Sequence, residues 1–202
     1  MNVISNILYW ISTGLLVPVI VLLIFFFIRA IILVGNFFGQ YITMKKTSAL
    51  LDSGIKTLTA DNLDGFVGSL PSKAADPVVG YIRNVVAAGG DEARVDLLVS
   101  EYEIAADKNL AVSKTMTKMG PILGLMGTLI PMGPALVGLA TGDIASMAYN
   151  MQVAFATTVV GLVVSAIGFL TQQVKERWFV RNLTVLEFVA HVVKQRHGEA
   201  VR

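Results

Sequence analysis

The chain has 202 residues, of which 54% are hydrophobic and only 15% are charged, and its formal net charge is +2 at pH 7. This low share of charge, with a mean hydropathy of +0.68, is typical of an integral membrane protein and argues against a soluble domain. The near-neutral charge gives no general attraction to nucleic acid. The absence of cysteine excludes disulfides, thiolate metal sites and cysteine nucleophiles.

The first apolar block covers residues 8–28, which is long enough to cross the hydrocarbon core of a bilayer. It lacks the basic flank and the small-residue cleavage site of a secretory signal, so we interpret it as a membrane span. Tyr9 and Trp10 suit a headgroup interface. Arg29 ends the strictly apolar run, and we interpret it as a side chain that snorkels to the membrane surface, with a role in an ion path as the alternative.

The polar segment 45–114 predicts short helices broken by Gly and Pro, followed by a long helix. Asp91 is a good N-cap for that helix, and nothing breaks the helical pattern before the next apolar block. The sequence therefore predicts one helix that continues into the membrane. No phosphate-binding loop, HExxH zinc motif or Gly-x-Ser-x-Gly nucleophile motif is present, so we do not expect an enzyme or a nucleotide-driven transporter.

Two further spans are predicted at about residues 115–140 and 147–172, joined by a tight turn. Asp143 is the sole charged residue between Pro121 and Val174, and we expect it to cap the third span or to lie in the turn. The tail 173–202 is predicted to be helical. Its two histidines, His191 and His197, are interpreted as solvated residues, so no metal or other cofactor is expected.

The basic residues predict the orientation of the spans, because positive charge stays on the cytoplasmic side. Neither the segment before residue 8 nor the turn between the later spans contains Lys or Arg. Basic residues flank the polar segment and follow the third span: Lys45, Lys46, Lys114, Lys118, Lys175, Arg177 and Arg181. We expect the N-terminus outside and the long loop and C-terminus in the cytoplasm.

The predicted fold is an all-α integral membrane protein with three transmembrane helices. Residues 1–44 form the first transmembrane helix and its extension, and residues 45–114 form a cytoplasmic helical loop. Residues 115–172 form a hairpin of two transmembrane helices, and residues 173–202 form a cytoplasmic C-terminal helix.

Both later spans carry a stripe of small or weakly polar residues at alternating spacings of three and four, which keeps them on one helix face. The first stripe comprises Thr117, Gly120, Gly124, Gly127, Pro131, Pro134 and Gly138, and the second comprises Ala154, Thr158, Gly161, Ser165, Gly168 and Gln172. In lipid, such stripes mark a close approach of another helix.

Two interpretations of the stripes stay open. They pack against each other within one subunit, or they line a narrow wet path. Thr128 and Thr158, which we expect at similar depths near the middle of their spans, favour a wet path, as do the backbone carbonyls that the prolines leave free. A mid-membrane threonine also commonly bonds a carbonyl of its own helix, which favours neither interpretation.

An ion path through a bilayer needs a titratable or anionic group at depth. The two later spans contain no such group away from the turn. If this chain conducts ions, the carboxylate must come from another polypeptide.

The stretch GPILGLMGTLIPMGPAL (residues 120–136) resembles the second-span signature of the MotA/TolQ/ExbB proton channel family, and AFATTVVGLVVSAIGFL (residues 154–170) resembles its third-span pattern. In its number of spans, three, the chain is similar to members of the TolQ/ExbB branch. The resemblance implies a homopentamer in the cell inner membrane, with the second and third spans around a central pore. It also implies a single-span partner related to ExbD, TolR or MotB, whose one aspartate takes and releases H⁺ or Na⁺.

The resemblance also suggests roles for particular residues. Thr128 and Thr158 fall on the family's pore threonines. The implied pore lining comprises Thr128, Thr158, Gly124, Gly127, Pro131, Gly161 and Ser165, and the implied groove for the partner's helix comprises Gly120, Pro134 and Ala154. The sequence departs from the TolQ/ExbB pattern at Val153, where those proteins carry a glutamate, and in its two prolines after Thr128, so roles in siderophore uptake or outer-membrane maintenance are not implied.

The leading functional hypothesis is the pore-forming subunit of an ion-driven motor that couples ion flow to mechanical work. The alternatives are a non-conducting membrane scaffold and a carrier of small substrates. Carriers commonly show internal repeats and a binding group at mid-depth, and neither is visible in this sequence.

Overall fold

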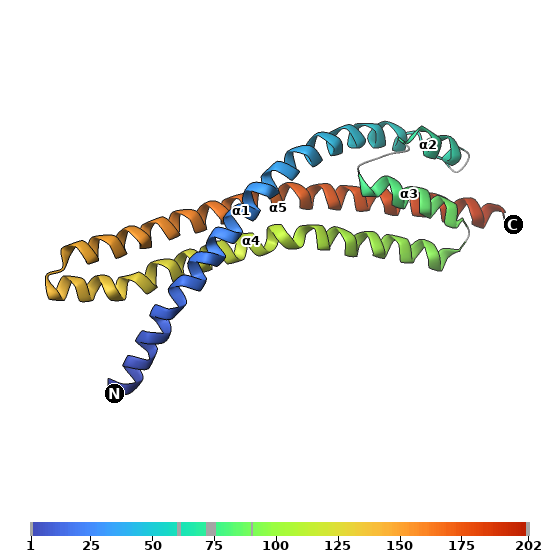
Figure 1. Ribbon diagram of the computed structural model, residues 1–202. Coiled ribbons are helices and arrows are strands. Elements are labelled where there is room, and N and C mark those ends of the chain that lie inside the picture. The colour runs from blue at the N-terminus through green and yellow to red at the C-terminus, as the bar shows by residue number, and fades with distance from the viewer. Residues whose placement is uncertain (1, 60–61, 72–75, 90, 201–202) are drawn as a thin grey trace. The chain divides into compact units, whose positions relative to one another are not determined.

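A computed structural model describes residues 2–59, 62–71, 76–89 and 91–200, and every regular element in that part of the chain is helical. In chain order the helices are α1 (Asn2–Ile55), α2 (Leu63–Ser69), α3 (Pro77–Ala88), α4 (Glu92–Thr141) and α5 (Ile144–Ala200) (Figure 1). The predicted all-α class is confirmed.

Three of the helices, α1, α4 and α5, are long and apolar enough to cross a membrane. Each contains one of the three predicted spans, so the chain is a multi-pass membrane protein. It divides into two compact units. The membrane unit comprises Met1–Val34 and Val112–Gln172, and the polar unit comprises Gly35–Ala111 and Gln173–Arg202.

Helix α4 begins and continues as the sequence predicts. The Asp91 carboxylate accepts a hydrogen bond from the Arg94 backbone N–H at 3.1 Å, which is the bond of an N-cap. The helix then runs without interruption to its last residue, although three prolines lie inside it. Prolines are tolerated in membrane helices because neighbouring groups can satisfy the carbonyls that they leave free.

Helix α1 is longer than expected. The sequence analysis assigned residues 45–55 to a loop of short helices, but α1 continues through them to Ile55. The reason is that no proline or paired glycine interrupts this stretch, and its threonines bond within the helix. Thr43 and Thr47 each donate to the carbonyl four residues earlier, at 3.1 and 3.2 Å, so their hydroxyls find partners within the continuous helix.

In the membrane unit, α1 packs against both α4 and α5 through apolar contacts. One cluster contains Val19, Leu23, Leu123 and Ile130, and a second contains Ala30, Leu33, Met116 and Val164. These contacts fix the relative depth of the three spans. Ala30 lies beside Met116, close to the predicted start of the second span, and Tyr9 comes near Gly133 at the other end.

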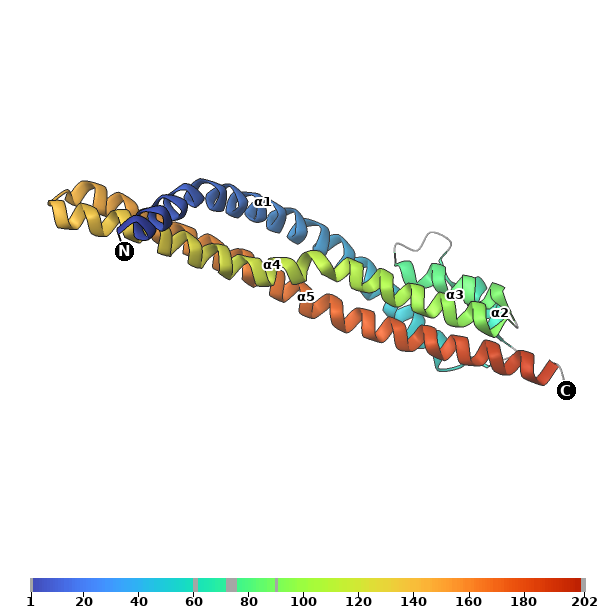
Figure 2. The same ribbon diagram turned by 90° about the horizontal axis from the view of Figure 1, so that it is seen from below.

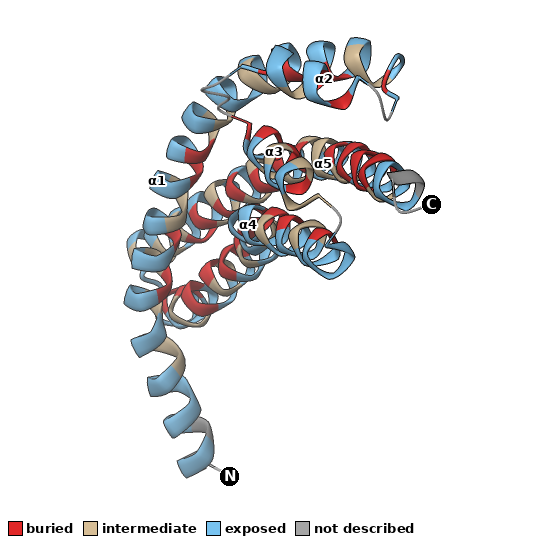
Figure 3. Ribbon diagram, turned by 90° about the vertical axis from the view of Figure 1, so that its right-hand side faces the viewer, coloured by how far each residue is buried: buried red, intermediate tan, exposed pale blue. Residues whose placement is uncertain are grey.

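The polar unit has its own apolar core, built where α2 and α3 cover α4, α5 and the end of α1. Fully buried members of this core include Val78, Ile82, Val95, Leu186 and Val189. Figure 3 shows buried residues on the faces that α3 and α5 turn toward each other, with exposed residues on their outer faces. Ion pairs at the rim join α5 to other helices, among them Arg181–Asp52, Lys194–Asp96 and Arg196–Asp64.

Asp76 starts α3 from a buried position. It is only 3% exposed, and its Oδ1 accepts a hydrogen bond from the Val78 backbone N–H at 3.1 Å, which caps the helix. The Asn182 side-chain amide, itself buried, lies 3.4 Å from both carboxylate oxygens. Burial raises the pKa of Asp76, partly offset by the Val78 and Asn182 hydrogen bonds, because a carboxylate loses favourable hydration when it leaves water.

We expect Asp76→Asn to be as stable as the wild type or more stable at neutral pH, and Asp76→Ala to be less stable by about 1 kcal/mol. Asparagine keeps the cap without a buried charge, whereas alanine removes the cap. Because the folded-state pKa of Asp76 is raised, burying its ionised carboxylate lowers the free energy of unfolding at neutral pH. This loss of stability disappears as the pH falls through the folded-state pKa. Thermal unfolding of the purified variants should therefore show any advantage of Asp76→Asn shrinking as the pH is lowered. An advantage that grows at low pH would contradict this account.

Candidate functional site

Helices α4 and α5 form an antiparallel hairpin whose turn is built by two residues. Gly142 has a positive φ of 78°, a conformation that glycine adopts without strain. Asp143 then accepts a hydrogen bond from the Ser146 backbone N–H at 3.0 Å and so caps α5, as predicted. In Figures 1 and 2 the two helices lie side by side along the hairpin.

The small residues of the two stripes allow the hairpin helices to touch at their backbones. A Cβ atom added at Gly120 would lie 2.6 Å from the Gly161 carbonyl oxygen, and one added at Gly161 would lie 2.6 Å from the Gly120 carbonyl oxygen. A Cβ at Gly127 would lie 2.5 Å from the Thr157 hydroxyl oxygen. A larger side chain at any of these positions would force the helices apart.

These contacts match the first interpretation of the stripes, packing within one subunit. The residues buried in this seam include Gly120, Gly124, Gly127, Ala154 and Gly161. Gly120 is one of the residues predicted to form the groove for a partner's helix. The space beside it is occupied by Gly161 and Ser165 of the same chain, because the two stripes fit each other.

Thr128 and Thr158 lie at the edge of the seam, where both are partly exposed. The Thr128 hydroxyl donates to the Leu125 carbonyl at 2.7 Å, and the Thr158 hydroxyl donates to the Ala154 carbonyl at 3.1 Å. Each hydroxyl keeps free lone pairs that can accept a further bond. A Cβ at Gly124 would lie 3.5 Å from the Thr158 Cα, and a Cβ at Gly127 would meet the side chain of Thr157. Thr158 therefore lies within about one helical turn of the level of Thr128.

Pro131 and Pro134, on the same stripe, differ in exposure. Pro131 is buried and Pro134 is partly exposed. Ser165 is partly exposed, and its hydroxyl donates to the Thr117 carbonyl at 3.0 Å. Ser165 therefore joins the two helices of the hairpin to each other.

The sequence analysis did not identify Thr157 as a seam residue. Its side chain is buried, and its hydroxyl donates to the carbonyls of Val153 and Ala154. The spacing rule admits a step of three as readily as a step of four after Ala154, so the pattern alone could not choose between Thr157 and Thr158.

A polar ladder joins α4 to α5 at the end of the hairpin away from the turn. The sequence analysis identified only part of it. Its members are Ser113, Thr117, Ser165, Thr171 and Gln172. The Thr117 hydroxyl donates to the Gln172 side-chain oxygen at 3.4 Å, and the Thr171 hydroxyl donates to the Ser113 hydroxyl at 3.3 Å. Interhelical bonds of this kind contribute roughly 0.6 kcal/mol each in membranes, so the ladder adds to the packing contacts that set the register of the hairpin.

Arg29 is exposed next to Ala30, at the depth of Met116. Its guanidinium carbon lies 6.0 Å from the centre of the Phe25 ring, a cation–π geometry. This position, near the predicted membrane surface, agrees with snorkelling and not with a place in the middle of the span.

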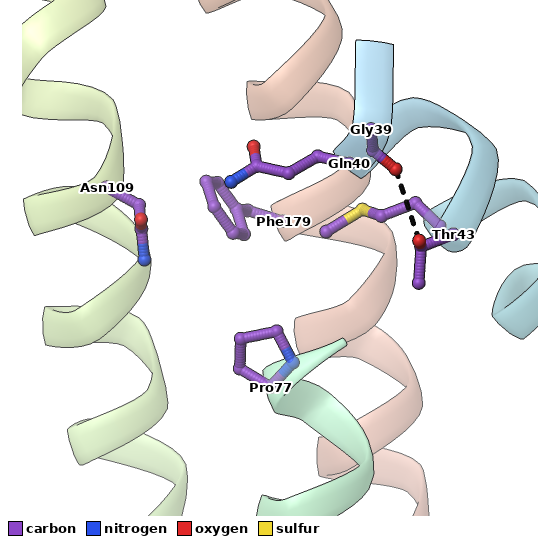
Figure 4. A pocket seen from close by; sticks show the side chains of 7 residues that line it. Gly39, Gln40, Thr43, Pro77, Asn109 and Phe179 are labelled. Carbon is purple, nitrogen blue, oxygen red and sulfur yellow. Dashed lines mark hydrogen bonds between the residues drawn. The ribbon is translucent and has the colours of Figure 1, made fainter. Parts of the chain in front are cut away.

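The polar unit contains a cavity of about 200 Å³, shown in Figure 4. It is lined by Gly39, Gln40, Thr43, Met44, Pro77, Asn109 and Phe179. No ionisable side chain is in this lining. The Thr43 hydroxyl donates to the Gly39 carbonyl, and one N–H of the Asn109 amide donates to the Ala105 carbonyl at 3.2 Å, so these two donors are engaged within their own helices.

A family model described as the MotA/TolQ/ExbB proton channel family matches residues 87–187, half of the chain. The chain belongs to the MotA/TolQ/ExbB proton channel family. The match covers the predicted transmembrane hairpin, residues 115–172, including both threonines and all the small residues of the seam. A comparison with curated proteins found no match.

Membership of the MotA/TolQ/ExbB proton channel family makes this chain a membrane protein of an ion-channel family and not of an enzyme class. The same match does not distinguish the TolQ/ExbB branch from the others. Residues 121–174 contain no Asp, Glu, His, Lys or Arg except Asp143, which lies at the turn.

Proposed function

We propose that this chain is the pore-forming subunit of an ion-driven motor in the cell inner membrane. Ion flow, of H⁺ or Na⁺, would be coupled to mechanical work through a separate single-span protein with one intramembrane aspartate. The observation that carries the proposal is that the matched hairpin offers partly exposed hydroxyls at depth but no acid group. A path for H⁺ or Na⁺ needs such a group, so it must arrive on a partner.

In the proposal, the chain forms a homo-oligomer, which the family resemblance gives as a pentamer. Thr128 and Thr158 face the pore, where each can accept a hydrogen bond from a protonated carboxyl group or coordinate an ion. Pro134, partly exposed on the same stripe, borders the partner's helix.

The remaining small residues support these two threonines from behind. Gly124, Gly127, Pro131, Gly161, Ser165 and Ala154 hold the hairpin together, so that the pore-facing groups keep fixed positions. The proposed orientation has the N-terminus outside and the polar unit in the cytoplasm, because the basic residues gather around the polar segments.

The main rival is a non-conducting scaffold, and one observation favours it. The seam is filled by the chain's own backbone and side chains, as in a helix pair that has only a structural role. The two functions differ in the partner that they need, because a scaffold does not require a carboxylate in the partner's membrane helix.

The proposal is tested by purifying the full chain in mild detergent with whatever remains bound, measuring the native mass and sequencing the bound protein. We expect five copies of the 21.7 kDa chain together with a single-span protein that carries one intramembrane aspartate. A bound protein with no acid group in its span would overturn the motor assignment in favour of the scaffold. A ring with a different number of copies would overturn the pentamer alone.

A further inference from the structure

The cavity of the polar unit lies where four helices meet (Figure 4). Helix α1 contributes four residues between Gly39 and Met44, and α3, α4 and α5 contribute Pro77, Asn109 and Phe179. The volume of the cavity is about 200 Å³, and an apolar cavity of about 150 Å³ is large enough to hold benzene. The cavity therefore has room for one compact molecule somewhat larger than a single aromatic ring.

Much of the cavity wall is apolar, and part of the lining is open to solvent. Met44 and Phe179 are half-buried, whereas Pro77 and Asn109 are exposed, so a molecule can enter from the surrounding water. A Cβ atom added at Gly39 would meet nothing within 4 Å, which leaves open space beside α1. An aromatic ring in a cavity wall, such as that of Phe179, attracts a second ring by stacking or by edge contact. The site therefore suits a molecule with a flat aromatic body.

The polar groups of the lining offer more acceptors than donors. The Thr43 hydroxyl uses its only hydrogen on the Gly39 carbonyl, which leaves the lone pairs of its oxygen free. The Asn109 amide uses one N–H on the Ala105 carbonyl, which leaves its oxygen and its other N–H. In the part of the chain that the structure describes, the Gln40 amide makes no hydrogen bond, and Figure 4 shows Gln40 and Asn109 on different helices around the cavity. A ligand that donates a hydrogen bond can therefore choose among three oxygen atoms.

The seven described residues of the lining include no ionisable side chain, so a charged ligand would lose hydration there without gaining an opposite charge. We propose that this cavity binds an uncharged aromatic molecule of about the size of indole that donates at least one hydrogen bond. Such a ligand contacts α1, α3, α4 and α5 together, and its binding stabilises the folded chain. The site lies wholly within the polar unit, so it does not depend on the proposed pore or on an oligomer.

Indole is a suitable probe, because it is uncharged and planar and carries one N–H donor. Radiolabelled indole is dialysed against the purified full chain in detergent, with empty micelles as the blank. We expect saturable binding of one molecule per chain. 1-Methylindole, which lacks the N–H, should bind about three- to tenfold more weakly, because one hydrogen bond is lost. Absence of saturable binding, as in a cavity that holds only water or detergent, would overturn the proposal, and equal affinity for the two molecules would overturn the required hydrogen bond.

Two variants and a matched control assign the binding to the cavity. Gly39→Leu places a side chain in the open space of the lining and should lower the affinity for indole about tenfold or more. Asn109→Leu removes the amide at similar volume and should lower the affinity about three- to tenfold. Both positions are exposed, and thermal unfolding without indole checks that each variant is folded.

Gly35→Leu is the control. Gly35 is also a glycine of α1 at which a Cβ would meet nothing within 4 Å, but it lies about one turn from Gly39 and outside the cavity lining. This variant should bind indole as the wild type does. Affinity that is unchanged in both Gly39→Leu and Asn109→Leu, or that falls equally in Gly35→Leu, would show that indole binds elsewhere and would overturn the proposal.

Discussion

Replacing Thr158 with valine is expected to leave the chain folded and assembled but to lower partner-dependent ion flux about 10- to 100-fold. Valine keeps the shape of threonine and removes only the hydroxyl, which in the fold bonds a carbonyl of its own helix at 3.1 Å. Loss of that bond costs well under about 1 kcal/mol in a membrane. A hydrogen bond to a charged or proton-transferring group is worth about 1.5–3 kcal/mol, which corresponds to the expected change in rate. Thr128→Val should also lower the partner-dependent ion flux.

Flux is measured by proton or sodium uptake into liposomes that contain the chain together with its partner. Thr157→Val is the matched control, because Thr157 is the next residue along α5 but is buried in the seam with its hydroxyl bonded to its own helix. Thr158→Ser should restore flux, since it returns the hydroxyl. Normal flux in both the Thr158→Val and Thr128→Val variants would remove these threonines from the pore.

Gly161→Val is expected to separate the hairpin helices and destabilise the membrane unit by about 3 kcal/mol or more, at the upper end of what overpacking costs. A Cβ at this position would lie 2.6 Å from the Gly120 carbonyl oxygen and 2.9 Å from the Gly124 Cα. Both are backbone atoms, so no side chain can turn away to make room. The oligomer should be lost along with the register of the hairpin, which native mass and thermal unfolding in detergent will detect.

Gly14→Val is the control for the intrinsic effect of placing valine in a membrane helix. A Cβ at Gly14 has no atom within 4 Å, so this variant should unfold within a few degrees of the wild type and keep its oligomeric state. Equal losses in both variants would mean that helix propensity, and not the close approach of α4 and α5, accounts for the effect.

The seam explains why glycine is concentrated in a membrane helix. In water a glycine weakens a helix, but in lipid the backbone hydrogen bonds of a helix have no competing water. What glycine offers there is space, and Gly120 and Gly161 use it to bring the α4 and α5 backbones into contact. The same close packing gives Thr128 and Thr158 their partly exposed positions at the edge of the seam.

Residue pattern alone determined much of this protein. Hydrophobic length predicted three spans, one in each long helix, and the capping residues Asp91 and Asp143 marked where α4 and α5 begin. These features depend on interactions between residues near one another in the chain, so they can be read from spacing and residue type. The paired span motifs likewise pointed to the proton channel family that the match over residues 87–187 supports.

Other features were decided only by the tertiary structure. The spacing of the small residues predicted which face of each helix carries a stripe, but not what that face contacts. The structure shows that Gly120 contacts Gly161 and that Thr157, not Thr158, occupies the space beside Gly127. The relative depth of Thr128 and Thr158 depends on how α4 and α5 are aligned along each other, and the buried position of Asp76, which caps α3, is shared with Asn182 from far along the chain. Such relations join residues distant in sequence, and the register of two helices is set by the sum of their side-chain contacts, which neither helix pattern contains by itself.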